Sequence, residues 1–154
     1  MPIIELIDGQ TLPTAAPVAI IRPSDGEPWV LATGLTGVGE FVGTPDPDLF
    51  CIAERYGRVI WVNAHTREQF DQGRLHPVHV ASAVDQGLLL IAGNTSITAL
   101  GVDGVRWEAR GLVGEDVHIT RSDGDRVYFR GLDFDGDGVR EARGSLDART
   151  GEVL

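Results

Sequence analysis

Lysine is absent from this sequence, and all 13 basic residues are arginine. Schiff-base catalysis and a Walker-type phosphate loop both need a lysine side chain, so neither chemistry is available. The single cysteine, Cys51, excludes an internal disulfide framework and a multi-cysteine metal site. The longest uninterrupted apolar runs, such as Leu88–Ala92, are far shorter than the ~20 residues that a membrane helix needs.

The start of the chain also lacks the basic segment and the small-residue cleavage site of a secretory signal, so we expect a cytoplasmic protein. Acidic residues outnumber basic ones by 23 to 13, which gives a net charge of −10. A surface of that charge repels nucleic acid and anionic membranes, and we expect neither as a partner. The charge instead predicts a protein partner with a basic surface, or a cation.

Helical periodicity is nearly absent as well, because 20 glycines and eight prolines interrupt the chain every few residues. Between them lie short segments rich in branched and aromatic residues, which is typical of strands joined by hairpins. In one segment Val105, Trp107 and Ala109 alternate with charged residues, the period-two pattern of a half-buried antiparallel strand. The sequence therefore predicts a single all-β domain over residues 1–154.

A repeat of about 39 residues organises these segments. Leu49–Ala53 resembles Leu88–Ala92, and Trp29 lies two such steps before Trp107. The repeat predicts four units, the first of them shortened, over residues 3–34, 40–75, 79–110 and 116–154. A propeller-like array of four-stranded antiparallel units has this spacing. A two-sheet β-sandwich built from the same hairpins is the alternative.

The end of the chain carries a more specific pattern, because Leu146–Leu154 contains an apolar-Asp-Ala element, a Thr-Gly turn and then Glu-Val-Leu. It resembles the outer hairpin of quinoprotein-like and WD-like β-propeller repeats. That resemblance implies blades that present a rigid face of loops for binding. The ring of cofactor-binding residues in full quinoprotein enzymes has no counterpart here, so we expect no pyrroloquinoline quinone.

Three and a half units are few for a closed ring. Either Ile3–Ile7 completes the last sheet within one chain, or two chains join their ends. Unpaired strand edges tend to find another strand, so the second solution, a homodimer, is the one we favour.

The sharpest chemical motif is a run of alternating aspartates near the C-terminus. Asp133, Asp135 and Asp137 offer hard carboxylate oxygens, Val139 a carbonyl, and Glu141 a further carboxylate, in the order that Ca²⁺ sites use. The pattern resembles the D-x-D-x-D-G loops of integrin-type propeller repeats, inserted between the second and third strands of the last unit. We therefore expect a calcium site, and the alternative is an acidic hairpin tip without metal.

No assembled catalytic constellation is visible, and a non-enzymatic binding module is the predicted function. One alternative is an acidic inhibitor or immunity-type protein that masks a basic partner. The other is a hydrolase or lyase with acidic residues in a central channel. Convergence of five carboxylates on one pocket would favour the enzyme, and dispersal over hairpin tips would favour binding: Asp46, Asp48, Asp85, Asp103 and Glu115.

The remaining chemistry-bearing side chains have structural interpretations. His76 and His79 supply only two imidazoles where zinc wants three or four ligands, and His65 and His118 stand alone. Cys51 lies in an apolar strand and is expected to be buried. The three tryptophans are expected to pack between blades: Trp29, Trp61 and Trp107.

Overall fold

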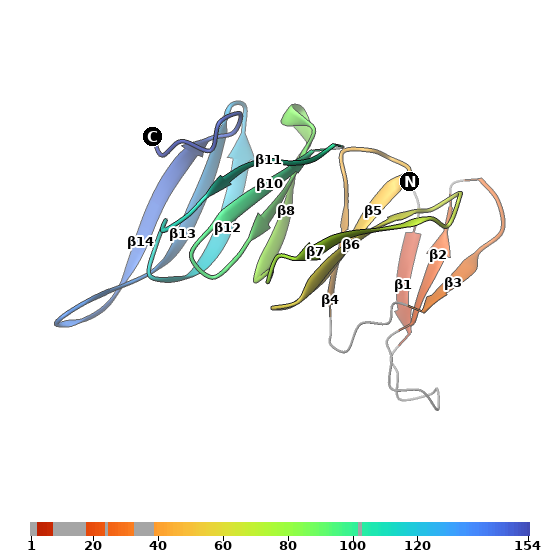
Figure 1. Ribbon diagram of the computed structural model, residues 1–154, viewed down its shortest axis with the longest axis horizontal. Helices are drawn as coiled ribbons and strands as arrows, with labels where there is room; N and C mark the ends of the chain where they lie inside the picture. The colour runs from red at the N-terminus through yellow and green to blue at the C-terminus, as the bar shows by residue number, and fades with distance from the viewer. Residues whose placement is uncertain (1–2, 8–17, 24, 33–38, 102) are drawn as a thin grey trace.

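The computed structural model describes residues 3–7, 18–23, 25–32, 39–101 and 103–154. These residues form four small antiparallel sheets, and their only helical segment is the short 3-10 turn η2, Val84–Gln86. The prediction of an all-β fold is therefore confirmed. Figure 1 shows the sheets standing in a row, with the N-terminal sheet at one end and the C-terminal sheet at the other.

Each sheet is a meander in which consecutive strands pair. The N-terminal sheet contains β1 (Ile3–Ile7), β2 (Val18–Arg22) and β3 (Trp29–Ala32). The second sheet contains β4 (Gly39–Gly43), β5 (Leu49–Glu54), β6 (Arg58–Asn63) and β7 (Gln69–Arg74). The third sheet contains β8 (His79–Ala83), β9 (Leu88–Ala92), β10 (Ile97–Gly101) and β11 (Gly104–Ala109). The C-terminal sheet contains β12 (Glu115–Asp123), β13 (Arg126–Asp135) and β14 (Gly138–Asp147).

Three apolar layers hold the row together, one between each pair of neighbouring sheets. Ile21 and Leu31 of the first sheet pack on Phe50, Ile52 and Val62 of the second. Successive side chains of a strand point to opposite faces of its sheet, so each inner sheet contributes alternate residues to the layers on its two sides. The second layer includes Cys51, Trp61, Leu89 and Ile91. The third layer, between the last two sheets, includes Leu90, Trp107, Val117, Phe129 and Leu146.

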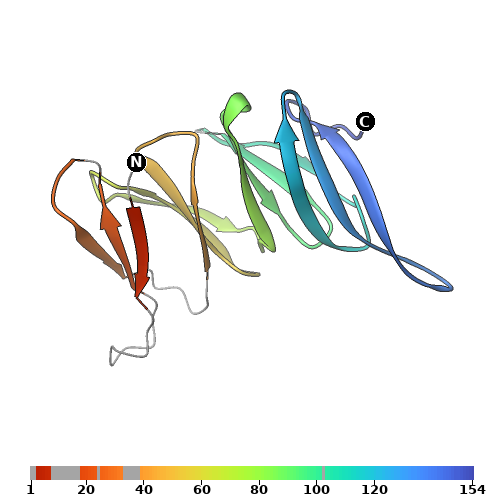
Figure 2. The same ribbon diagram turned by 180° about the vertical axis from the view of Figure 1, so that it is seen from behind.

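The first strands of successive sheets lie next to one another. β8 contacts both β4 and β12, so these three strands form one continuous inner edge of the row. Seen from behind in Figure 2, the three strands keep this order along the row. The inner edge brings equivalent positions of different repeat units together.

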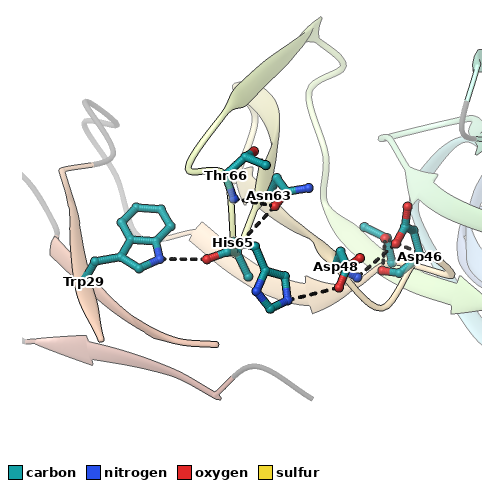
Figure 3. Close-up of polar contacts among 8 residues, drawn as sticks. Trp29, Asp46, Asp48, Asn63, His65 and Thr66 are labelled. Atoms are coloured by element: carbon teal, nitrogen blue, oxygen red, sulfur yellow. Dashed lines mark hydrogen bonds and ion pairs between the residues drawn. The ribbon is translucent and has the colours of Figure 1, made fainter. Parts of the chain in front are cut away.

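Two tryptophans fasten neighbouring sheets through the same contact. The indole N–H of Trp29 donates to the carbonyl of Ala64 at 2.9 Å, and that of Trp107 donates to the carbonyl of Ala148 at 2.8 Å. Each acceptor lies in a turn of the next sheet, as Figure 3 shows for Trp29. These two tryptophans therefore pack between sheets, as the sequence predicted, and Trp61 is buried at 3% exposure in the second layer.

The accepting turn is built by a local side-chain contact. In the second sheet the side-chain oxygen of Asn63 accepts the N–H groups of His65 and Thr66, each at 2.9 Å. In the C-terminal sheet the carboxylate of Asp147 accepts hydrogen bonds from the N–H groups of Arg149 and Thr150. These donors follow Asp147 by two and three residues, as His65 and Thr66 follow Asn63. Asx side chains stabilise turns in this way. The Thr-Gly pattern of the sequence thus corresponds to a repeated turn.

The structure argues against one of the two alternatives for the chain ends and corrects one expectation. β1 pairs with β2, and Figure 1 places it at the far end of the row from the C-terminal sheet, so Ile3–Ile7 does not complete the last sheet in this structure. The expected loop insertion in the last unit is instead a continuous hairpin, because β13 and β14 remain paired as far as Asp135 and Gly138. The described residues also form neither a two-sheet sandwich nor a closed ring. The linkers 8–17 and 33–38, which the predicted first unit and its boundary include, lie outside the described residues.

Candidate functional site

The C-terminal sheet ends the row, so one of its two faces has no neighbouring sheet (Figure 1). We call this the open face. Alternation along β13 turns Val127 and Phe129 toward the third sheet and leaves Tyr128 and Arg130 on the open face. Arg143 lies opposite Arg130 in the β13–β14 register and joins them there.

A register shift in β12 adds a further arginine to the open face. His118 lies opposite Arg130, and the pairing then slips between Ile119 and Arg121. The slip sets Arg121, rather than Thr120, opposite Tyr128. Bulges of this kind commonly re-aim side chains at sheet edges and functional sites.

A groove of about 580 Å³ extends from the open face to the inner edge, where His79 of β8 in the third sheet also lines it. Ten residues from four strands line it: His79, His118, Ile119, Thr120, Arg121, Tyr128, Phe129, Arg130, Arg143 and Gly144. Its volume is in the range of ordinary ligand sites, ~300–1,000 Å³. Three of these ten residues are arginines and none is acidic, although the chain as a whole carries a charge of −10.

The three arginines differ in how they are held. The guanidinium of Arg121 stacks on the ring of Tyr128, 4.1 Å from its centroid. Arg143 and Arg130 share one carboxylate, Glu141, with N–O distances of 2.5 and 3.4 Å. The hydrogen bond and charge of Arg143, with a smaller contribution from Arg130, lower the pKa of Glu141. Glu141 is therefore ionised at neutral pH, and two cations of the groove are balanced by a single anion.

A row of titratable side chains runs along the inner edge toward this groove. Glu40 of β4 lies 4.0 Å from the ring of His79 in β8, and its carboxylate also accepts the backbone N–H of Val80. The imidazoles of His79 and His118 lie 5.3 Å apart between centroids, and His118 is 3.8 Å from Asp116. Glu40, His79 and His118 are spaced 39 residues apart, so they hold the same position in three successive units.

The repeat could have revealed this row. The spacing of 39 was established from apolar segments, and the same step applied to polar residues connects Glu40, His79 and His118. Pairing His79 with its sequence neighbour His76 did not connect it with Glu40 and His118. In the structure the Nδ1 of His76 lies against the carbonyl of Tyr56, away from this row. The groove arginines gave no such signal, since each looks like an ordinary exposed residue of an alternating strand.

The predicted calcium ligands are distributed over both faces of the β13–β14 hairpin. Asp133 and Asp135 lie two residues apart on one face, where Asp133 accepts the backbone N–H of Gly114 at 2.8 Å. Arg140 lies 3.8 Å from Asp135, and Asp137 is in the turn. Val139 and Glu141 face the opposite side, because they pair with Phe134 and Leu132. Within the described ranges, no three His, Cys, Asp or Glu side chains form a group that could hold a metal ion. The calcium site stays a prediction.

The five carboxylates considered for channel chemistry lie in four separate places. Asp46 and Asp48 are in the β4–β5 turn, where Asp48 pairs with His65 at 3.1 Å (Figure 3). Asp85 is in η2, Asp103 is in the β10–β11 turn, and Glu115 begins β12. None of the five lines the groove, and they come from turns and strand ends of three different sheets.

Cys51 is fully buried in β5, and burial, together with the charge of Glu40, raises the pKa of its thiol to about 12. A thiol of that pKa carries no thiolate at neutral pH and is no nucleophile. No helix in the described ranges has the length and apolar character to cross a bilayer. A scan against protein families finds no match to this chain. A comparison with curated proteins finds no match either, so the function has to be argued from the site itself.

Proposed function

We propose that this protein is a non-enzymatic interaction module of the propeller-repeat type, and that it binds a protein partner through the open face of its C-terminal sheet. The meander order of every sheet, the continuous inner edge of β4, β8 and β12, and the repeated tryptophan contact support the propeller-type assignment. Folds of this type host many functions, so the assignment alone carries no activity.

The observation that carries the proposal is the groove at the open face. The three surfaces between neighbouring sheets are filled by apolar layers. At the open face, arginine, histidine and tyrosine side chains surround a hollow instead. Arginine and tyrosine are enriched in protein interfaces, where they account for much of the binding energy. The dispersed carboxylates and the protonated Cys51 thiol favour binding over catalysis.

Site-specific photo-crosslinking in the native host tests this function. A photoreactive amino acid replaces Thr120, which is exposed at the groove, and a matched control carries it at Gln69, which is exposed on β7 of the second sheet. We expect a discrete cross-linked protein from position 120 and none from position 69. Equal capture from both positions, or none from either, contradicts a binding role for the open face.

A charge-reversed variant gives a second readout of the same function. Arg121→Glu places a negative charge in the groove, and Arg74→Glu makes the same change on exposed β7. The Thr120 cross-link is expected to weaken with Arg121→Glu and to persist with Arg74→Glu. Retention of the cross-link in both variants would show that the partner ignores the groove.

A further inference from the structure

We propose that the groove binds an acidic segment of the partner protein, with aspartate or glutamate carboxylates seated between the arginines. This inference rests on the function proposed above and names the chemistry of the partner. It differs from the expectation based on net charge, which predicts a basic partner, because three arginines and no acidic residue line the groove of an otherwise acidic chain.

Arg121 is held in place for binding a carboxylate. Its guanidinium is stacked on Tyr128 at 4.1 Å, and among the described residues no carboxylate forms an ion pair with it. A stacked guanidinium has lost part of its freedom before a ligand arrives, so less entropy is lost on binding. Its planar donor fork matches a carboxylate, with which it can form two parallel hydrogen bonds.

The other two arginines are incompletely neutralised. Arg130 and Arg143 share the single carboxylate of Glu141, and their side chains are 51% and 78% exposed. Guanidinium groups have five N–H donors each, so donors remain for an incoming anion. His79 and His118 add imidazole nitrogens at the inner end of the groove. Among its three arginines the groove therefore has one carboxylate for three cations, so arginine donors remain for an anion, whereas Glu40 and Asp116 lie beside the two imidazoles at its inner end.

The size of the groove and the charge of the surrounding chain favour an acidic protein segment over a nucleic acid. A nucleic acid is longer than the groove, and its phosphates would meet the rest of a chain that has 23 acidic residues and only 13 arginines, three of them in the groove. Repulsion of that kind acts over about a Debye length, ~8–10 Å at moderate salt. A short acidic segment places its charge inside the groove alone. Because the surrounding acidic surface repels the acidic segment, the groove is its preferred binding site on this protein.

The experiment is fluorescence anisotropy of the full chain with a labelled hexaglutamate peptide at low salt. Hexaglutamine of the same length tests whether carboxylates are needed, and oligothymidylate tests the nucleic-acid alternative. We expect saturable binding of hexaglutamate, no binding of hexaglutamine, and weaker binding of oligothymidylate. Rising salt should weaken the hexaglutamate complex.

Two variants test the site, and a third is the matched control. Arg121→Ala removes the stacked guanidinium, and we expect a loss of affinity of about five- to tenfold. Glu141→Gln removes the competing carboxylate, and we expect an affinity gain of about two- to fivefold. Arg74→Ala on β7 is the matched control and should leave the affinity unchanged.

Each contrary outcome has a separate meaning. Equal affinity for hexaglutamine, or a tighter oligothymidylate complex that Arg121→Ala disrupts, overturns the acidic-segment proposal. So does a hexaglutamate affinity that neither Arg121→Ala nor Glu141→Gln changes. If hexaglutamate does not bind but Thr120 still cross-links a partner, the acidic-segment proposal fails and the interaction function stands. If both results are negative, both proposals fail.

Discussion

Replacing Trp107 by phenylalanine tests whether a single hydrogen bond fastens the C-terminal sheet to the row. The Trp107 side chain is 8% exposed, and its indole N–H donates to the carbonyl of Ala148, a residue that is itself fully buried. Phenylalanine keeps a six-membered aromatic ring but has no N–H group to donate. The Ala148 carbonyl then stays buried without its side-chain partner.

The expected loss of stability follows from two terms. Leaving a buried acceptor unsatisfied costs about 1–3 kcal/mol. The smaller ring removes roughly one methylene-equivalent of burial, about 1 kcal/mol. We therefore expect Trp107→Phe to lower the free energy of unfolding by about 2–4 kcal/mol, a large share of the ~5–15 kcal/mol that holds a typical domain.

Urea unfolding followed by far-ultraviolet circular dichroism measures this loss, because the signal comes mainly from the peptide backbone rather than from the replaced indole. Val105→Ala, on the same strand and 60% exposed, is the control and should change stability by no more than about 0.5 kcal/mol. Trp29→Phe removes the equivalent bond at a part-buried site and should cost less than Trp107→Phe. A loss below about 0.5 kcal/mol for Trp107→Phe would refute the assigned role of the bond.

Four further outcomes are expected. Gly151→Ala should lower the melting temperature, because Gly151 has a φ of 75° and a Cβ there would lie 2.6 Å from Trp107, whereas Gly136→Ala, which meets no atom within 4 Å, should not. Cys51, with its pKa raised to about 12 by burial, should resist a thiol reagent at mildly alkaline pH until the protein is unfolded; reaction of the folded protein at the unfolded rate would contradict its burial. If the aspartate hairpin binds calcium, a hundredfold excess over Kd should stabilise the parent by about 2.7 kcal/mol relative to chelator, and Asp135→Ala should lose that gain; equal melting temperatures of the parent in calcium and chelator would rule the site out. The homodimer predicted from the unpaired ends would cover the open face, so detection of a homodimer by light scattering at high concentration would contradict the partner site there, and a strict monomer would reject the predicted joining of ends.

The strands could be predicted from the sequence because their signal is local. Alternation at Val105–Ala109 and the repeated Leu49–Ala53 and Leu88–Ala92 segments gave strands that differ from the structure by a residue or two at their ends. The spacing of Trp29 and Trp107 likewise predicted their equivalent positions between sheets. The aspartate run was misread as a loop, because turn residues such as Gly136 dominate the pattern although the flanking residues continue to pair.

The candidate site could not be predicted in the same way. Arg121 reaches the open face only through a register shift, and pairing shifts leave no mark in one sequence. Arg143 and His79 come from different sheets, and their proximity depends on how the row is assembled. That the C-terminal sheet has an uncovered face is a property of the whole arrangement (Figures 1 and 2) and of no residue within it.

The row of sheets also sets how the protein fluctuates. A sheet inside the row is held by apolar layers on both faces, whereas the C-terminal sheet is held on one face alone. In a nearest-neighbour array of this kind, stability is a sum of unit and interface terms, and the ends open first. Backbone amides of β12–β14 should consequently exchange with solvent through partial openings that leave the second sheet intact. The groove thus lies on an end unit of the row, which can rearrange around a bound segment while the sheets inside the row stay folded.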